Sequence, residues 1–515
     1  MTDLKHFGNS SPEFAPPDRA SPRYLRSQFR FSLWPCRNYR HNVGVTQVSV
    51  IGAGPNGLSA AIHAAMAGFP VEVFEAEAIP GGAARTLPLT LPGYLHDFGS
   101  AVHPMAAGSP FFRSLSLENH GLSWLHAEIP LAHPFDDGSA VVLYRDLAET
   151  APNLGLDSKI WLRIMRPLAN NWWSFAEDAL TPILRFPNQP VLMARFGLNA
   201  MLSAKAFTHL HFQLRRTRAL FAGLAAHSFM ELNAPFSSAI GLVLAAAAHS
   251  VGWPIPRGGA QSLTNALIDC LHGLNGALHT SRRISLLDEL PHPQSLIFCD
   301  LTPRQLVRVA GDRLSPGYTQ KLQRYRYGPG SFKIDYALSE PVPWRAPECR
   351  KALTLHLGGS FEEIANAESA VLCGDHPDHP FVLVSQPTIC DPSRAPRGRH
   401  ILWAYCHVPN GSPVDMTQRI EAQIERFAPG FRDCILARNI SSPRTLESMD
   451  ANLVGGDING GAFSLRQLFF RPTRDYYATS NRHIYLCSAS TPPGGGVHGM
   501  CGYHAVEAAL LTRGA

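Results

Sequence analysis

The sequence predicts an α/β protein of more than one structural unit, and three observations support this. The chain has 515 residues, whereas single domains typically hold about 100 to 200. Residues 47–75 follow the order strand, glycine-rich turn, helix, strand, acidic residue. Residues 484–509 repeat the order strand, glycine-rich turn, helix. Such units build sheets of parallel strands covered by helices, and a chain of this length has a core large enough to enclose a bulky ligand.

The charge of the chain is concentrated at its beginning. The net charge is +5, and residues 1–45 carry seven basic and three acidic residues, so the other 470 residues carry only +1. We therefore predict no nucleic-acid partner. Charged residues make up 17% of the chain, below the typical quarter of a globular protein, which indicates much buried surface or an apolar binding site.

Residues 1–45 are rich in Pro, Ser and Arg, and we interpret them as a disordered basic extension. An organelle transit peptide and a basic aromatic arm for a membrane or nucleic acid are the alternatives.

The ten cysteines form no CxxC pair, so we expect reduced thiols in an intracellular protein without a dithiol centre or metal site. The predicted location is the cytoplasm, or the mitochondrial matrix if the extension is a transit peptide.

The segment 51–57 reads IGAGPNG, in which Gly52, Gly54 and Gly57 have the GxGxxG spacing. A predicted strand precedes the turn and an Ala-rich helix follows it to about Ala67. Gly52 permits the tight turn, Gly54 lets the backbone approach a pyrophosphate, and Gly57 lets the helix pack closely on the strand. The helix start offers free amides and a positive dipole end to phosphates, so the segment predicts a dinucleotide site.

Glu75 directly follows the second predicted strand, Val71 to Phe74. It lies 18 residues after Gly57. Its carboxylate is placed to accept hydrogen bonds from a ribose, and it disfavours a 2′-phosphate there because like charges would meet. No second GxGxxG with a preceding strand occurs downstream. This unit alone does not decide between NAD and FAD.

Three further segments carry glycines or polar side chains suited to a cofactor. They are GGAART at 81–86, DFGSAVHP at 97–104, and STPPGGGVHG at 490–499. The last one again directs backbone amides and a helix start at an acceptor, and that dipole would stabilise an anionic reduced flavin.

These motifs resemble those of the FAD-dependent phytoene desaturase and carotenoid isomerase superfamily, which is related to amine oxidases. The stretches RGGAQSLTNAL (257–267), RYGPGSFKIDYAL (326–338) and GGDINGGAFSLRQLFFRP (455–472) are most similar to the branch of pyridine nucleotide-disulfide oxidoreductase domain-containing protein 2. The resemblance runs from about Thr46 to the C-terminus. It implies FAD as the cofactor, and the absent CxxC means that the chain cannot carry out disulfide chemistry.

The resemblance also implies an α/β fold in which a Rossmann-like FAD-binding domain is built from discontinuous segments and carries an inserted α+β substrate domain. We assign residues 46–146, 250–330 and 455–515 to the FAD-binding domain, and residues 147–249 and 331–454 to the substrate domain. Residues 147–248 show helical periodicity with aromatics, and 332–338 and 400–405 alternate with the period of strands. Residues 283–287 resemble the strand beside the adenine, and 295–299 resemble a return to the parallel sheet.

The predicted FAD contacts are taken from the glycine motifs and their neighbours: Ile51, Gly52, Gly54, Pro55, Asn56, Gly57, Glu75, Gly82, Arg85, Gly495, Gly496 and Val497. His103, His498 and Tyr503 are the candidate proton donors or acceptors, with His504 a weaker one, because imidazole titrates near neutral pH. The competing interpretation for each is a side chain that only hydrogen-bonds to other residues behind the site, or that lies on a helix face. Asp457 and Arg466 are candidates for the flavin edge, while Trp403, Tyr405 and Tyr336 are expected in the core more often than at a substrate.

We predict an FAD-dependent oxidoreductase that transfers hydride from an apolar, isoprenoid or lipid-like substrate to flavin N5, or isomerises that substrate. Oxygen or a quinone is the expected electron acceptor, and peripheral contact with a membrane is an open option. The rivals are an amine or amino-acid oxidase and a non-catalytic flavin-binding regulatory protein. The sequence does not decide the oligomeric state.

Overall fold

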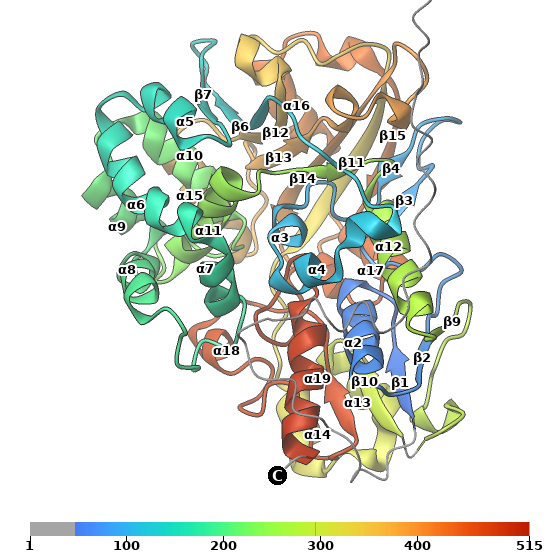
Figure 1. Cartoon of the computed structure of the whole chain (residues 1–515). Coiled ribbons are helices and arrows are strands. Elements are labelled where there is room, and N and C mark those ends of the chain that lie inside the picture. The colour runs from blue at the N-terminus through green and yellow to red at the C-terminus, as the bar shows by residue number, and fades with distance from the viewer. Residues whose placement is uncertain (1–46, 294, 514–515) are drawn as a thin grey trace, which may run out of the picture. The chain divides into compact units, whose positions relative to one another are not determined.

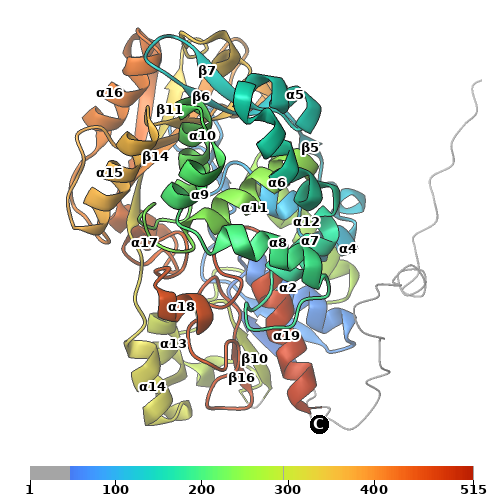
Figure 2. The same ribbon diagram turned by 90° about the vertical axis from the view of Figure 1, so that its left-hand side faces the viewer.

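The computed structural model describes residues 47–293 and 295–513, all within one compact unit, 43–515. The predicted basic extension, residues 1–45, lies outside the described residues. In the described part the strands form two large sheets and two short pairs (Figures 1 and 2). The short pairs are β3 (Thr86–Leu87) with β4 (His96–Asp97), and β5 (Trp124–Leu125) with β8 (Ile255–Pro256).

The first sheet is parallel and collects strands from distant parts of the chain. Its order is β16 (Ile484–Leu486), β10 (Leu296–Cys299), β1 (Val48–Ile51), β2 (Val71–Phe74) and β9 (Ala277–His279). Both faces of β1, β2 and β10 are buried, as parallel strands require. One face packs against α2 (Pro55–Met66), α12 (Ala260–Gly273) and α19 (Met500–Arg513). The other face packs against α13 (Pro303–Ala310) and α14 (Pro316–Gln323).

The second sheet is mixed and has seven strands in the described part. Its order is β15 (Ile435–Ser441), β11 (Gly330–Leu338), β14 (His400–Val408), β13 (Val382–Ser385), β12 (Ala352–Leu357), β6 (Ile129–Pro134) and β7 (Ala140–Leu143). One face is apolar and packs against α16 (Thr417–Phe427). The opposite face presents Ser331, Lys333 and Asp335 from β11, and Trp403 and Tyr405 from β14. The sheet therefore carries a hydrocarbon face and a polar, aromatic face.

Helices cover the polar side of this sheet. They lie together as a layer at the left of Figure 1 and at the front of Figure 2. The layer consists of α5 (Leu147–Asn153), α6 (Ser158–Asn170), α7 (Trp172–Ala179), α8 (Pro190–Ala200), α9 (Ala204–His211), α10 (Arg215–Ala226) and α11 (Ser237–Ser250). The remaining helices are α3 (Pro104–Ala107), α4 (Pro110–Leu115), α15 (Phe361–Leu372), α17 (Pro443–Met449) and α18 (Leu465–Phe469).

The predicted fold class is confirmed, because the structure contains the parallel sheet and the Rossmann-like arrangement expected from the glycine motif. One predicted strand is wrong. Residues 283–287 form no strand, and the strand beside β2 is β9, which follows the Asn275-Gly276 turn. Ile284 and Leu287 are apolar because they pack beneath the sheet. The Ser285 amide bonds to the Glu289 carboxylate rather than to a neighbouring strand.

The strand pairing also bears on the domain division at residue 146, which stays a prediction. β6 and β7 lie within 46–146, yet β6 pairs with β12 and so belongs to the seven-stranded sheet. The Asp137-Gly138 turn between β6 and β7 is a hairpin signal, but β12, the other strand that pairs with β6, lies more than two hundred residues further along the chain. We propose that the substrate domain includes 129–143 and otherwise follows the predicted division.

The packing of α19 on α2 yields a stability prediction. A Cβ atom at Gly502 would lie 1.9 Å from the Asn56 carbonyl oxygen on α2. We expect Gly502→Ala to force the two helices apart and to lower the free energy of unfolding by about 1–3 kcal/mol. Urea unfolding followed by far-UV circular dichroism measures this.

Gly197→Ala is the matched control. Gly197 lies within α8, and a Cβ atom there meets nothing within 4 Å. We expect this change to raise the free energy of unfolding by about 0.5–1 kcal/mol, because alanine favours the helix. A Gly502→Ala protein as stable as the wild type would contradict the close helix contact.

Candidate functional site

A cavity of about 790 Å³ joins the carboxyl ends of the parallel strands to the polar face of the seven-stranded sheet. Its lining begins at Ile51 and Glu75, continues past His103 and His498, and ends at residues of β11 to β14. Open α/β sheets bind ligands beyond the carboxyl ends of their strands. The cavity therefore has a dinucleotide end and a second end enclosed by the other sheet.

The glycine-rich turn shapes the first end. Gly52 has φ +97°, which an L side chain rarely adopts, and a Cβ atom at Gly57 would lie 2.1 Å from the Gly52 carbonyl oxygen. Pro55 occupies the first turn of α2, where its missing N–H is not needed. These constraints bring the start of α2 close to β1 and direct its backbone towards the cavity.

Glu75 is fixed by two backbone amides beside this turn. The Ala53 amide donates to Oε2 at 2.7 Å, and the Glu77 amide donates to Oε1 at 2.9 Å. The side chain is 8% exposed and lines the cavity. Its carboxylate oxygens keep further acceptor capacity for the hydroxyl groups of a ribose.

Asp300 directly follows β10 and occupies the crevice between β10 and β1. The Gly57 amide donates to its Oδ2 at 3.0 Å. Burial raises the pKa of Asp300 to about 7, the Gly57 hydrogen bond opposes this, and the carboxylates of Asp450 and Glu75 add to it. Burial also raises the pKa of Asp450, which Arg85 partly offsets. The dinucleotide end therefore holds carboxyl groups that are protonated more readily than usual.

The second glycine-rich segment forms the facing wall through Gly495, Gly496, Val497 and His498. His498 is buried, and its Nδ1 accepts the Met500 amide at 3.1 Å. Burial lowers the pKa of His498 to about 4. A neutral imidazole therefore lies where α19 approaches the cavity.

His103 lies in the cavity wall just before α3. It is 1% exposed and lines the cavity. Burial lowers the pKa of His103 to about 4, although the nearby Asp97 carboxylate and the Ser100 backbone oppose the shift. Neither ring nitrogen makes a hydrogen bond of good geometry within the described residues, so His103 is a candidate for contact with a ligand.

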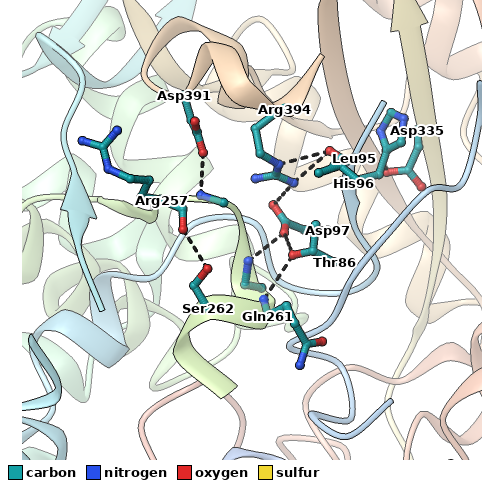
Figure 3. A network of polar contacts seen from close by, with 12 residues as sticks. Thr86, Leu95, His96, Asp97, Arg257, Gln261, Ser262, Asp335, Asp391 and Arg394 are labelled. Atoms are coloured by element: carbon teal, nitrogen blue, oxygen red, sulfur yellow. Dashed lines mark hydrogen bonds and ion pairs between the residues drawn. The ribbon is translucent and has the colours of Figure 1, made fainter. Parts of the chain in front are cut away.

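Figure 3 shows a buried network around Asp97, the carboxylate that acts on the pKa of His103. Asp97 forms an ion pair with Arg394 at 3.0 Å. Asp97 Oδ1 also accepts the Thr86 hydroxyl and the Ala260 amide, each at 2.8 Å. Arg394 donates to the Leu95 carbonyl. The network connects residues 86–97 to the start of α12 and to the loop after β13.

Most of the predicted cofactor residues lie together along the cavity. Eleven of the twelve line it, and Gly57 is the exception because its amide is turned to Asp300. Arg85 lines the cavity but donates to the carbonyls of Gly82 and Met449, so it also fixes the two loops. His103, His498 and Asp457 line the same cavity. Their assignment to FAD or catalysis remains a prediction.

Other candidates lie elsewhere. Tyr503 packs against His63 and Phe111, with ring centroids 4.5 and 5.2 Å away, and does not line the cavity. Tyr503 and His504 both lie on α19, whose helical rotation turns them from the cavity that His498 reaches. Arg466 is exposed on α18, and Tyr336 lies on the apolar face of its sheet.

The structure adds cavity residues that the sequence analysis did not select. Asp300 and Asp450 line the dinucleotide end, and Lys333 lines the far end together with Trp403 and Tyr405, which were expected mainly in the core. The sequence could have predicted Asp300 as a site residue. It follows the predicted strand 295–299, and residues at the carboxyl ends of parallel strands border ligand-binding sites. Lys333 lines the cavity because of the register between β11 and β14, and no local sequence pattern predicts that register.

The lining fits a dinucleotide with a polar head and a ring system. Buried atoms without a partner include Asn56 Oδ1, Ser100 Oγ and Asn459 Nδ2, all on cavity-lining residues. Leaving such groups unpaired costs about 1–3 kcal/mol each, so they favour a bound group that hydrogen-bonds at this end. Within residues 47–293 and 295–513, no cluster of three or more His, Cys, Asp or Glu side chains could hold a metal ion.

The fold and the cavity define a dinucleotide-binding protein of the Rossmann class. Residues 50–115 match the model of the NAD(P)-binding Rossmann-like domain. Pyridine nucleotide-disulfide oxidoreductase domain-containing protein 2 of Rattus norvegicus is 25% identical, over 89% of this chain and 92% of that protein. All-trans-zeta-carotene desaturase of Myxococcus xanthus is 24% identical, over 91% of this chain and 94% of that protein.

Solved structures show the same fold. An oxidoreductase from Methanosarcina mazei has a TM-score of 0.60 at 17% identity, covering 90% of this chain and 99% of that one. Putrescine oxidase bound to putrescine has a TM-score of 0.57 at 16% identity, covering 91% and 98%. By sequence, the homologues of this chain include pyridine nucleotide-disulfide oxidoreductase domain-containing protein 2 and the carotene and phytoene desaturases. The homologues include proteins named as desaturases and oxidoreductases, and they support the predicted FAD-dependent oxidoreductase.

The glycine turn gives a direct test of where the cofactor lies. A Cβ atom at Gly54 would lie 2.8 Å from Asp300 Oδ2, and a valine would also crowd a pyrophosphate approaching the turn. We expect Gly54→Val to be purified without flavin absorbance and to regain none on incubation with FAD. Visible spectroscopy and circular dichroism measure flavin content and folding.

Gly317→Val is the control, because a Cβ atom at Gly317 meets nothing within 4 Å. It should retain flavin as the wild type does. Wild-type flavin content in a folded Gly54→Val protein would show that the cofactor does not lie against this turn.

Proposed function

We propose that the chain dehydrogenates or isomerises an isoprenoid or lipid-like substrate with FAD bound along the cavity. The continuity of the cavity carries this proposal, since one space reaches from the dinucleotide end to the polar face of the seven-stranded sheet. Bound FAD would supply a hydride acceptor at N5. Relatives whose names state a substrate include all-trans-zeta-carotene desaturase and phytoene desaturase.

The residues of the chain divide the work of binding. The turn 52–57 and the start of α2 would receive the pyrophosphate, and Glu75 would hold the ribose. Gly495 to Val497 would face the ring through backbone amides. Ile240, Val243 and Leu244 of α11 line the chamber and would exclude water from the reacting carbon.

His103 is the proposed proton acceptor. Because burial lowers its pKa to about 4, the imidazole is neutral at physiological pH and can take a proton on the one ring nitrogen that carries no hydrogen. The Asp97 carboxylate beside it would stabilise the imidazolium that forms. The ion pair between Asp97 and Arg394 keeps that carboxylate in place.

The amine-oxidase alternative has one observation in its favour, which is the structural likeness to putrescine oxidase. The electrostatics of the chamber disfavour it. Lys333 lines the cavity, is 3% exposed and is paired with the Asp335 carboxylate, so that carboxylate is not free to bind a substrate ammonium group. Aromatic positions at the far end, Trp403 and Tyr405, are adjacent to Lys333.

Reduction of the bound flavin under anaerobic conditions tests the reaction class. We expect isoprenoids or other lipid-like compounds to bleach the flavin absorbance, while a panel of primary amines leaves it unchanged. His103→Gln should slow bleaching by about a hundredfold or more, and His272→Gln on the surface should not.

Bleaching by amines with release of hydrogen peroxide would favour the oxidase alternative. A protein whose flavin no substrate reduces, and which general reductants scarcely reduce, would support the regulatory alternative. The proposed electron acceptor is oxygen or a quinone, which stopped-flow reoxidation distinguishes. A cytoplasmic location remains the proposal for the compartment.

We also propose that the protein collects its substrate at an anionic membrane surface. Within the described residues, no helix is both long enough and apolar enough to cross a bilayer. The segment 183–201 is nevertheless unusually apolar at its surface. Phe186 is 84% exposed, Leu184 60%, and Val191 and Leu198 each 68%. In α8 only Ala200 is fully buried.

The charge around this segment favours lipid over a second copy of the chain. The charged residues within 183–201 are Arg185 and Arg195, and the carboxylate of the flanking Asp178 is occupied by the Asn188 and Gln189 amides. Two copies pairing through this surface would bring like charges together, whereas anionic headgroups would neutralise them. Ala179 and Leu180 line the cavity, so the apolar loop begins just beyond the chamber wall.

Vesicle flotation with the full chain tests this surface. We expect binding to phosphatidylcholine vesicles that contain phosphatidylglycerol and much weaker binding to phosphatidylcholine alone. The triple change Ile183→Ser, Leu184→Ser and Phe186→Ser should lower the partition coefficient at least tenfold, because these apolar side chains no longer enter the bilayer. Leu372→Ser, at a residue 41% exposed at the end of α15, is the matched control.

All variants retain residues 1–45, so any contribution of the basic extension is constant. Unchanged partitioning of the triple variant would overturn the proposal. So would a wild-type dimer, seen by light scattering, that the triple variant dissociates.

A further inference from the structure

We propose that the far wall of the cavity is a binding site for an acceptor oxygen of the substrate, a carbonyl or a carboxylate. The substrate would then be amphipathic, with an apolar chain and an oxygen-bearing end, rather than a pure hydrocarbon. This inference rests on the proposed function, because it names the substrate class of the same cavity.

The wall is formed by side chains that neighbour one another across adjacent strands. In the sheet register, Trp403 of β14 pairs with Ser385 of β13, and Ser385 pairs with Thr354 of β12. All three line the cavity. We call Trp403, Ser385 and Thr354 the polar row.

Each member of the polar row has a polar atom without a partner. Trp403 Nε1, Ser385 Oγ and Thr354 Oγ1 are buried and make no hydrogen bond within the described residues. Ser385 is 0% exposed and Thr354 is 5% exposed. Buried polar groups in native proteins nearly always have partners, so three neighbouring exceptions on one cavity wall indicate a ligand group that supplies them.

The chemistry of the row selects an acceptor. An indole N–H can only donate, and the two hydroxyls can donate as well. Lys333 lies beside the row, with its Nζ 5.8 Å from the Trp403 ring centroid. Its ammonium is paired with the Asp335 carboxylate, so the wall favours hydrogen-bond acceptors and does not demand a full negative charge.

The opposite wall is different in kind. Ile240, Val243 and Leu244 of α11 line the cavity there, and they offer only hydrocarbon. A carotene-like hydrocarbon would satisfy this wall and leave the polar row unpaired. A substrate with a chain and an oxygen function matches both walls.

A matched set of ligands tests the inference without turnover. Farnesene, farnesal and farnesoic acid share one isoprenoid skeleton and differ at the end of the chain. Binding to the FAD-loaded full chain is measured by perturbation of the flavin spectrum and by the shift in thermal midpoint. We expect farnesal or farnesoic acid to bind at least tenfold more tightly than farnesene, and the better of the two identifies a carbonyl or a carboxylate.

Variants of the row locate the preference. Ser385→Ala with Thr354→Val, and separately Trp403→Phe, should each reduce the preference for the oxygenated ligand at least threefold, with farnesene binding unchanged or tighter. Thr217→Val is the control, because Thr217 Oγ1 is also buried without a partner but Thr217 is not among the residues lining the cavity.

Equal affinity for the three ligands in the wild type would overturn the inference and would show that ordered water satisfies the row. A preference that survives in all row variants would also overturn it. Absence of bound flavin would instead count against the proposed function, so the two failures are distinguishable.

Discussion

The buried ion pair between Asp97 and Arg394 is the contact on which the cavity depends. Its two side chains are 1% and 0% exposed, and removing charges from water is costly unless further hydrogen bonds satisfy them. Asp97 obtains these from Thr86 and the first amide of α12, and Arg394 from Leu95. Because Arg394 comes from the loop after β13, the pair fixes the seven-stranded sheet against the cofactor segments. The pair thereby fixes the distance between the dinucleotide end of the cavity, at the turn 52–57, and the polar row.

The electrostatics change along the cavity in a way that suits a flavin enzyme. Carboxyl groups with a raised pKa, Asp300 and Asp450, lie at the dinucleotide end. Neutral imidazoles, His103 and His498, lie in the middle because burial lowers the pKa of each to about 4. The first pair tolerates the approach of phosphate because protonation relieves repulsion at modest cost. The second pair can accept protons at physiological pH without holding a standing charge near an apolar substrate.

How much the sequence could predict depended on how local each feature is. The turn 52–57 with Glu75 is a short-range motif, and its position at the cradle follows from strand and helix order. The strand β9 was missed because the apolar residues at 283–287 imitate a strand, whereas Ile284 and Leu287 are apolar for packing beneath the sheet. The pairing of β6 with β12 could not be predicted locally because β12 is distant in the chain. Tyr503 does not line the cavity because helical rotation on α19 separates it from His498.

The low charged fraction of the chain does not distinguish an apolar binding site from a polar but uncharged one. A charged share of 17% fits an enclosed apolar cavity, and the α11 wall agrees with that interpretation. The opposite wall achieves polarity with Ser, Thr and Trp, which add hydrogen-bonding capacity without adding formal charge. Composition counts such a wall as uncharged and cannot separate it from a hydrocarbon surface. Only the register of β12, β13 and β14 brings Thr354, Ser385 and Trp403 side by side, and this proximity turns three ordinary residues into a candidate recognition site.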